Sequence, residues 1–291
     1  MINKGLTVTI IFEAESANYG ESIGNVSALK KISRGKGEQY TYISRQAIRY
    51  NIVNQMGIDN TKIGLDGSVL QFAPDTTIEE YPEIDLFGYM KTAKPSKTRS
   101  AIVRLSNAIS LEPYRGDLDF LTNKGLLDRY NKQKNELKDG GNIAQSEIHR
   151  SLYSYTITID LDKVGIDEND SIHIKNSEKA NRINKLLDTI RYLYRDIKGR
   201  REDLKPLFII GGVYDIKNPI FQNSMEVKNN NLIVDKIIDV LSEELEKETM
   251  SAIVKGLFEN ENEVIDRLGT TNMREFFEKI KLKVNDYYES N

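Results

Sequence analysis

Two arginines, Arg45 and Arg49, stand four residues apart in a segment with a helical apolar pattern, RQAIRYNIVNQM. Residues four apart lie on one face of a helix, so the two guanidinium groups would project together. Ser44 precedes them as a candidate N-cap, and Ile43 and Ile48 stand at the positions of a hydrophobic staple. Both arginines would lie near a helix N-terminus, where the dipole and free backbone N–H groups favour an anion. The pattern predicts a phosphate-binding face, and a solvated helix face is the open alternative.

The basic residues of the chain are concentrated toward its N-terminal part. The formal net charge is −3, but the distribution of charge over a surface matters more for binding than its sum. Residues 91–104 carry five basic side chains and no acid, whereas the chain from Asp235 onward is acidic. Residues 27–49 carry one acid, Glu38, against Lys30, Lys31, Arg34, Lys36, Arg45 and Arg49. This contrast predicts a protein with one basic face.

Two pairs of acidic side chains could support acid-base or metal chemistry. Glu13 and Glu15 are two residues apart on an extended segment and share a face, and Asp160 and Asp162 repeat that spacing. Solvated acids at strand ends explain both pairs more simply, and no glycine-spaced calcium loop surrounds the second pair. The chain has no cysteine and two histidines, which excludes thiolate clusters, disulfides and multi-histidine metal sites. We therefore expect no metal.

The sequence indicates neither a nucleotide cofactor nor a membrane segment. Gly211 and Gly212 follow the apolar run LFII but lack the full dinucleotide fingerprint and a helix start, so close backbone packing is the simpler reason for them. The N-terminal stretch MINKGLTVTIIFEAES has a single lysine, and its apolar run is broken by threonines and ends at Glu13. This is unlike a signal peptide or a spanning helix, so we expect a cytoplasmic protein without a cofactor.

The elements that must position these residues follow from apolar periodicity. Alternating β-branched residues predict strands over residues 6–14 and 153–161, and a continuous apolar run predicts a buried strand over residues 206–214. Stripes with a 3.6-residue period predict helices over residues 44–56 and 178–198.

The intervening segments predict insertions. The glycine-containing polar stretch between residues 15 and 43 predicts a long flexible loop, and residues 58–84 predict short strands or an inserted loop. Residues 123–150 predict a protruding loop or hairpin, whereas residues 99–111 fit a buried strand or a short helix. Beyond residue 231 we expect mostly helix, in two segments, 233–248 and 272–288.

The coarse order of elements matches a β-α-β-β-α-β ferredoxin-like domain of the α+β class. RNA-recognition domains share this plan, although a fold alone does not establish function. We expect an RNA-recognition-motif-like palm over residues 1–221, with a finger inserted at about 58–98 and a thumb at about 125–150. A mostly helical region, residues 222–291, would pack on the palm.

Three blocks of sequence carry a resemblance to a known family. The first is LTVTIIFEAESANYGESIGNVSALKKI followed by YISRQAIRYNI, and the second is DLFGYMKTAKPSKTRSAIVRLSNAISLEPYRGDLDFLTN. The third is GGNIAQSEIHRSLYSYTITIDLDKVG, with LFIIGGVYDIKNPIF further on. In order and spacing these blocks, which span most of residues 5–221, resemble the hand-shaped backbone subunit of CRISPR type I effector complexes (Cascade). The nearest branch is type I-B, the DevR-type proteins of the RAMP superfamily.

The resemblance implies a non-catalytic subunit that polymerises along the CRISPR RNA and grips its backbone. The bases would stay free to pair with target DNA, so that the guide reads sequence and the protein holds shape and phosphates in antiviral defence. Its partners would be further copies of itself, the large subunit and the subunit that caps the 5′ end of the guide.

The resemblance also assigns site residues by position. Ser44, Arg45, Gln46 and Arg49 would contact guide phosphates, and the basic loop with Lys30, Lys31 and Arg34 would meet RNA or a neighbouring subunit. Residues 139–150 stand where a thumb displaces bases at intervals. The residues expected near the displaced base or the strand are Met90, Lys91, Gln145, Ile148 and His149.

Two alternatives from other functional classes stay open. One is an RNA-cleaving enzyme of related fold that uses Glu13, Glu15 or Asp160. Type III relatives cut RNA with an aspartate in a loop near the first helix, and the corresponding stretch here, residues 21–39, contains no aspartate, so we expect no nuclease. The other is a stand-alone regulator that binds RNA or DNA with a fixed stoichiometry.

Overall fold

The computed structural model describes residues 3–35, 37–92, 94–140 and 143–291. Its centre is an eight-stranded sheet around β1 (Gly5–Ala14), which pairs antiparallel with β14 (Ser151–Asp160) on one side and β19 (Phe208–Tyr214) on the other. The sheet order is β22-β19-β1-β14-β11-β5-β4, and β10 also pairs with β14. The outer strands are β22 (Thr249–Ile253), β11 (Ala108–Ser110), β10 (Val103–Leu105), β5 (Glu38–Ile43) and β4 (Lys31–Arg34).

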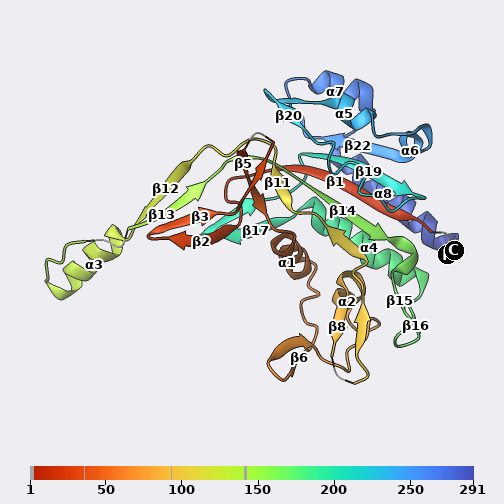
Figure 1. Cartoon of the computed structure of the whole chain (residues 1–291), viewed down its shortest axis with the longest axis horizontal. Coiled ribbons are helices and arrows are strands. Elements are labelled where there is room, and N and C mark those ends of the chain that lie inside the picture. Colours follow the sequence, from red (N-terminus) through yellow and green to blue (C-terminus); the bar gives the residue numbers. More distant parts are fainter. Residues whose placement is uncertain (1–2, 36, 93, 141–142) are drawn as a thin grey trace.

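Alternation along β1 divides the core into two layers. Leu6, Val8, Ile10 and Phe12 face a large apolar cluster shared with α1 (Arg45–Gln55), α4 (Asn176–Arg191) and α8 (Met273–Glu289). Ile11 instead joins a second cluster, which packs under α5 (Val234–Ile238) and α7 (Glu261–Leu268). Both faces of the sheet are therefore covered, and the expected strands and the first helix are confirmed (Figure 1).

Three segments differ from the sequence-based expectation. Residues 15–43 form β2 (Tyr19–Ile23), β3 (Val26–Leu29), β4 and β5 instead of a flexible loop, because glycines with positive φ, such as Gly24 and Gly35, close the turns. The helix expected to reach residue 198 ends at Arg191, and the chain continues as a hairpin of β17 (Tyr194–Ile197) and β18 (Arg200–Asp203). That hairpin turns through Lys198 and Gly199, which both have positive φ, as a two-residue hairpin turn requires.

The C-terminal part is not only helical. α8 begins after the N-cap Asn272, as expected, but the segment 233–248 contains two short helices, α5 and α6 (Glu243–Glu248). β22 then extends the main sheet beyond β19, because Ala252 and Ser251 can be buried there with their backbone paired. The remaining short elements are η1 (Leu161–Lys163), β15 (Ile166–Asp167), β16 (Ile172–His173), β20 (Val227–Lys228) and β21 (Asn231–Leu232).

Two projections extend from the sheet (Figure 1). The arm, residues 117–148, consists of β12 (Asp117–Thr122), α3 (Lys124–Lys134) and β13 (Ile143–Ile148), and it belongs to a second sheet of order β12-β13-β3-β2. The finger, residues 58–99, consists of β6 (Ile63–Asp66), β7 (Val69–Phe72), α2 (Pro82–Phe87), β8 (Tyr89–Lys91) and β9 (Lys97–Arg99). The two projections point in different directions, the arm to the left and the finger downward in Figure 1.

A buried charge cluster fastens the finger to the body. The Asp85 carboxylate, fully buried at the end of α2, accepts hydrogen bonds from Arg99 Nη2 at 2.6 Å, Arg182 Nη1 at 2.9 Å and the Gly165 backbone N–H at 2.9 Å. Arg182 lies on α4, so a finger residue is bonded directly to a helix of the body. Charged groups survive burial only when they are paired in this way.

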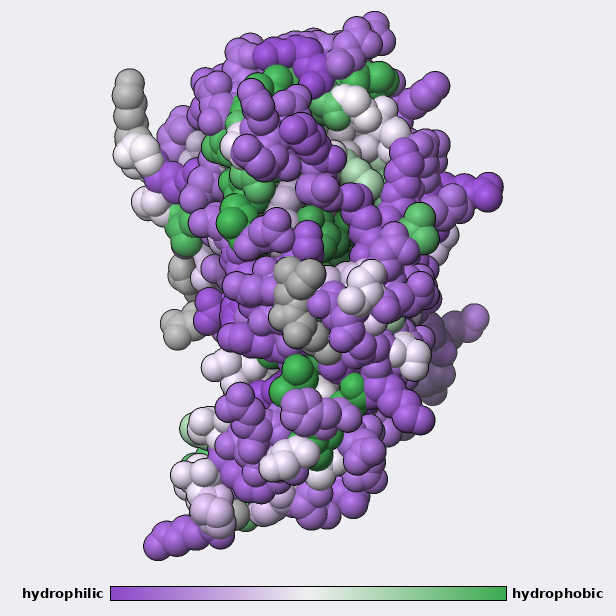
Figure 2. Space-filling model, turned by 90° about the vertical axis from the view of Figure 1, so that its right-hand side faces the viewer, coloured by the Kyte–Doolittle hydropathy of each residue, from purple (hydrophilic) through white to green (hydrophobic). Residues whose placement is uncertain are grey.

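The surface beside the C-terminus is largely hydrophilic. Figure 2 shows this side, with apolar residues gathered mainly in its upper part, near the C-terminal elements. Among the described residues, no helix is both long and apolar enough to span a bilayer.

Candidate nucleic-acid interface

The start of α1 is held by three protein acceptors. Ser44 is the N-cap, and its Oγ accepts from the Ala47 backbone N–H at 3.3 Å. The backbone N–H groups of Ser44 and Arg45 donate to the side-chain oxygens of Asn18, at 3.1 Å, and Asn107, at 2.9 Å. These amides are therefore occupied, so an anion bound here would depend chiefly on side chains and on the helix dipole.

A basic cavity of about 520 Å³ lies along the exposed side of α1. Helix α1 contributes Arg45, Gln46 and Arg49, and the facing wall comes from the finger and the main sheet. No carboxylate lines it, and the full lining is Arg45, Gln46, Arg49, Phe87, Ala101, Val103, Arg104 and Leu105. We call this the arginine cavity. Three guanidinium groups without an acid in the wall make a surface that attracts an anion.

The arginines of α1 differ in how they are held. Arg45 is exposed, and no carboxylate of the described residues forms a salt bridge with it. Arg49 is partly buried, with its guanidinium carbon 4.9 Å from the centroid of the Phe87 ring and Nη2 3.9 Å from Glu83 Oε1. Burial lowers the pKa of Arg49, and the charge of Glu83 opposes that effect. Packing on Phe87 fixes the guanidinium at the border of the cavity.

Arg104 was not among the residues expected to bind phosphate. It lies on β10 and is one of the residues that line the arginine cavity, with 46% of its side chain exposed. Its Nη1 is 3.0 Å from Asp160 Oδ2. The sequence contained one indication of it, the acid-free basic run 91–104, but nothing in that run separates Arg104 from its neighbours.

The basic residues of the β4–β5 region lie away from this cavity. Lys31 Nζ contacts Glu147 Oε2 at 2.6 Å and lies 4.3 Å from the centroid of the Tyr114 ring, which ties β4 to the arm. Lys30 is half-buried beside it, whereas Arg34 is exposed near the hairpin tip and stacks on Tyr40 at 5.3 Å. Of the three residues only Arg34 is exposed, and Lys31, which is paired with Glu147, is better described as a structural contact.

Met90 and Lys91 are adjacent on β8 and point to opposite sides of the strand, so Met90 is exposed and Lys91 is buried. Met90 is 58% exposed and lines an apolar cavity with Ile63, Val69 and Leu70. That cavity shares Arg49 and Phe87 with the arginine cavity, so the two adjoin.

Lys91, by contrast, is 2% exposed, and its Nζ donates to the Thr76 carbonyl. Its Nζ also lies 4.3 Å from the centroid of the Tyr89 ring, and burial lowers the pKa of Lys91. Lys91 is therefore too buried to be part of the interface.

The arm residues expected near RNA lie outside the arginine cavity. Gln145 and Ile148 are half-buried on β13. His149 is 5% exposed, and its Nδ1 is 2.8 Å from Thr41 Oγ1. Burial lowers the pKa of His149, and the Tyr114 ring packs edge-on against it at 5.5 Å. The imidazole is thus part of the arm's root and has no open face for stacking on a base.

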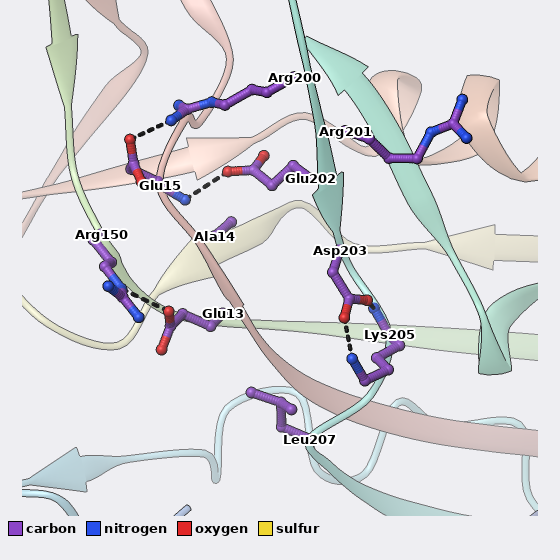
Figure 3. A pocket seen from close by; sticks show the side chains of 10 residues that line it. All are labelled: Glu13, Ala14, Glu15, Arg150, Arg200, Arg201, Glu202, Asp203, Lys205 and Leu207. Carbon is purple, nitrogen blue, oxygen red and sulfur yellow. Dashed lines mark hydrogen bonds and ion pairs between the residues drawn. The ribbon is translucent and has the colours of Figure 1, made fainter. Parts of the chain in front are cut away.

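The acidic residues considered for catalysis all have basic partners, arginines for Glu13, Glu15 and Asp160 and Lys217 for Asp162. Glu13 accepts from Arg150 Nε at 2.7 Å, Glu15 pairs with Arg200, and both line one mixed-charge cavity (Figure 3). Asp160 is nearly buried beside Arg104. Within the described ranges, no group of three or more His, Cys, Asp or Glu side chains is placed to hold a metal ion.

Comparison with known proteins places this geometry in context. The model of the family described as CRISPR-associated negative auto-regulator DevR/Csa2 matches residues 6–236. No curated protein is significantly similar in the corresponding search.

Among the solved structures that are similar to this chain are two from CRISPR complexes. A chain of a "CRISPR RNA-guided surveillance complex, pre-nicking" is 11% identical, with a TM-score of 0.57, 98% of this chain covered and 99% of that one. A chain of a "CRISPR RNA-guided surveillance complex" is 12% identical, with a TM-score of 0.51 and coverages of 87% and 90%. At these identities the likeness establishes the fold alone.

Proposed function

Because the chain belongs to the CRISPR-associated DevR/Csa2 family, we propose that it is a guide-RNA-binding backbone subunit of a CRISPR surveillance complex. The arginine cavity carries this proposal. Its side chains suit the phosphates of a single strand, because guanidinium groups bind phosphate through paired N–H donors. The bases of the bound guide would remain free to pair with target DNA.

The strand order supports an RNA-recognition-like palm. Four neighbouring positions of the sheet are occupied by β19, β1, β14 and, beside β14, the two short strands β10 and β11. In the chain these strands are separated by α1, which follows β1, and α4, which follows β14. Numbered along the chain, their order in the sheet is fourth, first, third, second, which is the order of a β-α-β-β-α-β ferredoxin-like domain. In this scheme the finger and the arm are insertions that follow the first helix and the second strand.

Apolar surfaces on the two projections support self-association. Single exposed apolar residues are ordinary on a protein surface, but these form two groups on separate projections. On the arm they are Leu118, Phe120, Leu121, Leu126, Leu137 and Ile143. On the finger they are Ile63, Leu65, Val69, Leu70 and Met90.

One segment of each projection is oppositely charged, residues 75–83 of the finger being acidic and helix α3 of the arm basic. On the finger the acidic side chains include Asp75, Glu79, Glu80 and Glu83, whereas α3 on the arm carries Lys124, Arg129, Lys132 and Lys134 against the single Asp128. A contact between two different surfaces of successive copies does not close on itself and generates a filament. We propose that the arm of one copy packs on the finger of the next, along the RNA.

We propose that the subunit is non-catalytic. The pairing of Glu13, Glu15 and Asp160 with arginines supports this, because a carboxylate held in an ion pair is a weak general base and a poor metal ligand. Guide RNA bound along successive subunits would then be protected from cleavage.

The family description itself favours a second candidate, a stand-alone regulator that binds nucleic acid with fixed stoichiometry. Both candidates are tested by binding the purified protein to single-stranded RNAs of increasing length and weighing the complexes by mass photometry. The backbone subunit predicts a copy number that grows with RNA length, and the regulator predicts one that does not.

The same experiment tests the site with matched variants. Arg45→Gln/Arg49→Gln removes two charges from the arginine cavity, and Arg267→Gln/Arg274→Gln removes two from α7 and α8. The first pair should weaken binding and reduce the salt slope by about 0.7 for each lost phosphate contact, whereas the second should change neither. Equal slopes for both variants would contradict the site, and magnesium-dependent RNA fragments would contradict the absence of catalysis.

A further inference from the structure

We infer that Arg104 is a third phosphate-binding arginine and contributes to the RNA site from strand β10. This inference rests on the proposed function and extends it, because it assigns a role to a residue of the palm sheet. Arg45 and Arg49 reach the arginine cavity from a helix, and Arg104 reaches it from strand β10. A phosphate between them would be held from two elements that are far apart in the sequence.

The charge balance of the cavity distinguishes Arg104 from the other surface arginines. The mixed cavity of Figure 3 also contains several basic side chains, among them Arg150, Arg200 and Arg201, but Glu13, Glu15, Glu202 and Asp203 line it as well. The wall that Arg104 joins has no carboxylate. The carboxylates that pair with Arg49 and Arg104, Glu83 and Asp160, do not line the cavity, so the charged side chains that an anion meets there are all basic.

Asp160 forms an ion pair with Arg104 but leaves part of its side chain exposed to solvent. Asp160 Oδ2 lies 3.0 Å from Arg104 Nη1, and almost half of the Arg104 side chain stays exposed. A guanidinium carries five N–H donors in a planar fork, so an ion pair through one of them leaves others for a phosphate. Because Asp160 is nearly buried and also lies 3.8 Å from Lys163 Nζ, its own position is well determined.

The register of the sheet fixes where this arginine stands. Arg104 pairs with Thr158 of β14, and the residues on either side, Val103 and Leu105, pair with Ile159 and Ile157. Just beyond β10, Asn107 accepts the Arg45 backbone N–H, which ties the first residue of α1 to the same corner of the sheet. Strand pairing and this hydrogen bond therefore hold Arg104 and the start of α1 at the same corner of the palm.

Lys163 supplies a matched control for the test. Arg104→Gln and Lys163→Gln each remove one positive charge beside the same carboxylate, but Lys163 does not line the arginine cavity. Binding would be measured with a single-stranded RNA of fixed length over a series of salt concentrations. Arg104→Gln should weaken binding about tenfold and lower the salt slope by about 0.7, and Lys163→Gln should leave the slope unchanged.

A double variant separates binding from folding. Arg104→Gln leaves Asp160 without its nearer partner, so Arg104→Gln/Asp160→Asn should recover thermal stability while the salt slope stays low. A slope for Arg104→Gln equal to that of Lys163→Gln, or restored by adding Asp160→Asn, would overturn the inference while the effect of Arg45→Gln/Arg49→Gln stood. If the latter variant also bound like the wild type, the proposed function itself would fail.

Discussion

The attachment of the finger to the body should depend on a single buried carboxylate, Asp85. In Asp85→Asn the side chain keeps its size but loses its charge, so the guanidinium group of Arg99 loses its carboxylate partner and that of Arg182 retains Glu178, at 3.0 Å. Those groups are themselves buried, because the side chains of Arg99 and Arg182 are 9% and 4% exposed. The three donors that now converge on Asp85 would meet a neutral amide, half of which is itself a donor.

The size of the effect follows from this geometry. Breaking a buried ion pair by removing one partner costs about 3 to 5 kcal/mol, because a charge is left uncompensated away from water. A domain of ordinary stability has about 5 to 15 kcal/mol in total, so Asp85→Asn should remove a large part of it. The loss should be greatest where α2, β8 and β9 join α4.

Urea unfolding followed by circular dichroism measures the change in the free energy of unfolding. Hydrogen exchange then locates it, with faster exchange expected in β8 and β9 than in β1. The control is Asp196→Asn, which removes the partner of Arg201 in an ion pair whose two side chains are both 65% exposed. This exposed pair should leave the unfolding midpoint unchanged. If the two variants were equally stable, the reasoning from burial would be refuted.

Three further predictions concern glycine packing and pH. Gly211→Ala should prevent stable folding, because a Cβ there would lie 2.0 Å from the Thr7 carbonyl oxygen; expression yield and thermal unfolding would reveal a tolerated alanine as a contradiction. Gly125→Ala should instead stabilise α3 by up to about 1 kcal/mol, because a Cβ there would have nothing within 4 Å. Slower hydrogen exchange of the α3 backbone amides would measure this gain. The pKa of His149 is lowered by burial, so the unfolded chain binds more protons and stability should fall as pH drops below about 6.5 toward that lower pKa. His149→Gln should flatten this part of the pH profile in urea titrations, His173→Gln should not, and an unchanged profile for both would exclude His149.

Local sequence patterns were sufficient for the elements that frame the site. The capping serine and the period of Ile48 and Ile52 predicted α1 correctly, because caps and helical stripes depend on residues within two turns of one another. The alternation in β1 and β14 was equally local. The strands of residues 15–43 were missed because glycine turns within a polar stretch fit a loop and a set of short hairpins equally well.

The reading of Gly211 and Gly212 as close-packing positions is confirmed. A Cβ on either would lie within 2.2 Å of a backbone oxygen, from Thr7 or Glu248. The residues that make these contacts are about 200 and 36 positions away in the chain, so the pattern indicated the cause but not the partner.

Residue types and their spacing determined, from the sequence alone, that α1 would carry two arginines on one face. Which basic residues face solvent was decided only by the tertiary structure. Lys31 pairs with Glu147, and Lys91 donates to the Thr76 carbonyl, whereas the pairing of β10 with β14 brings Arg104 to the same cavity as Arg45. A cation on a strand looks the same in sequence whether it points to water or to an acceptor. Its partner is fixed by long-range contacts, and burial decides whether the charge is available to a ligand.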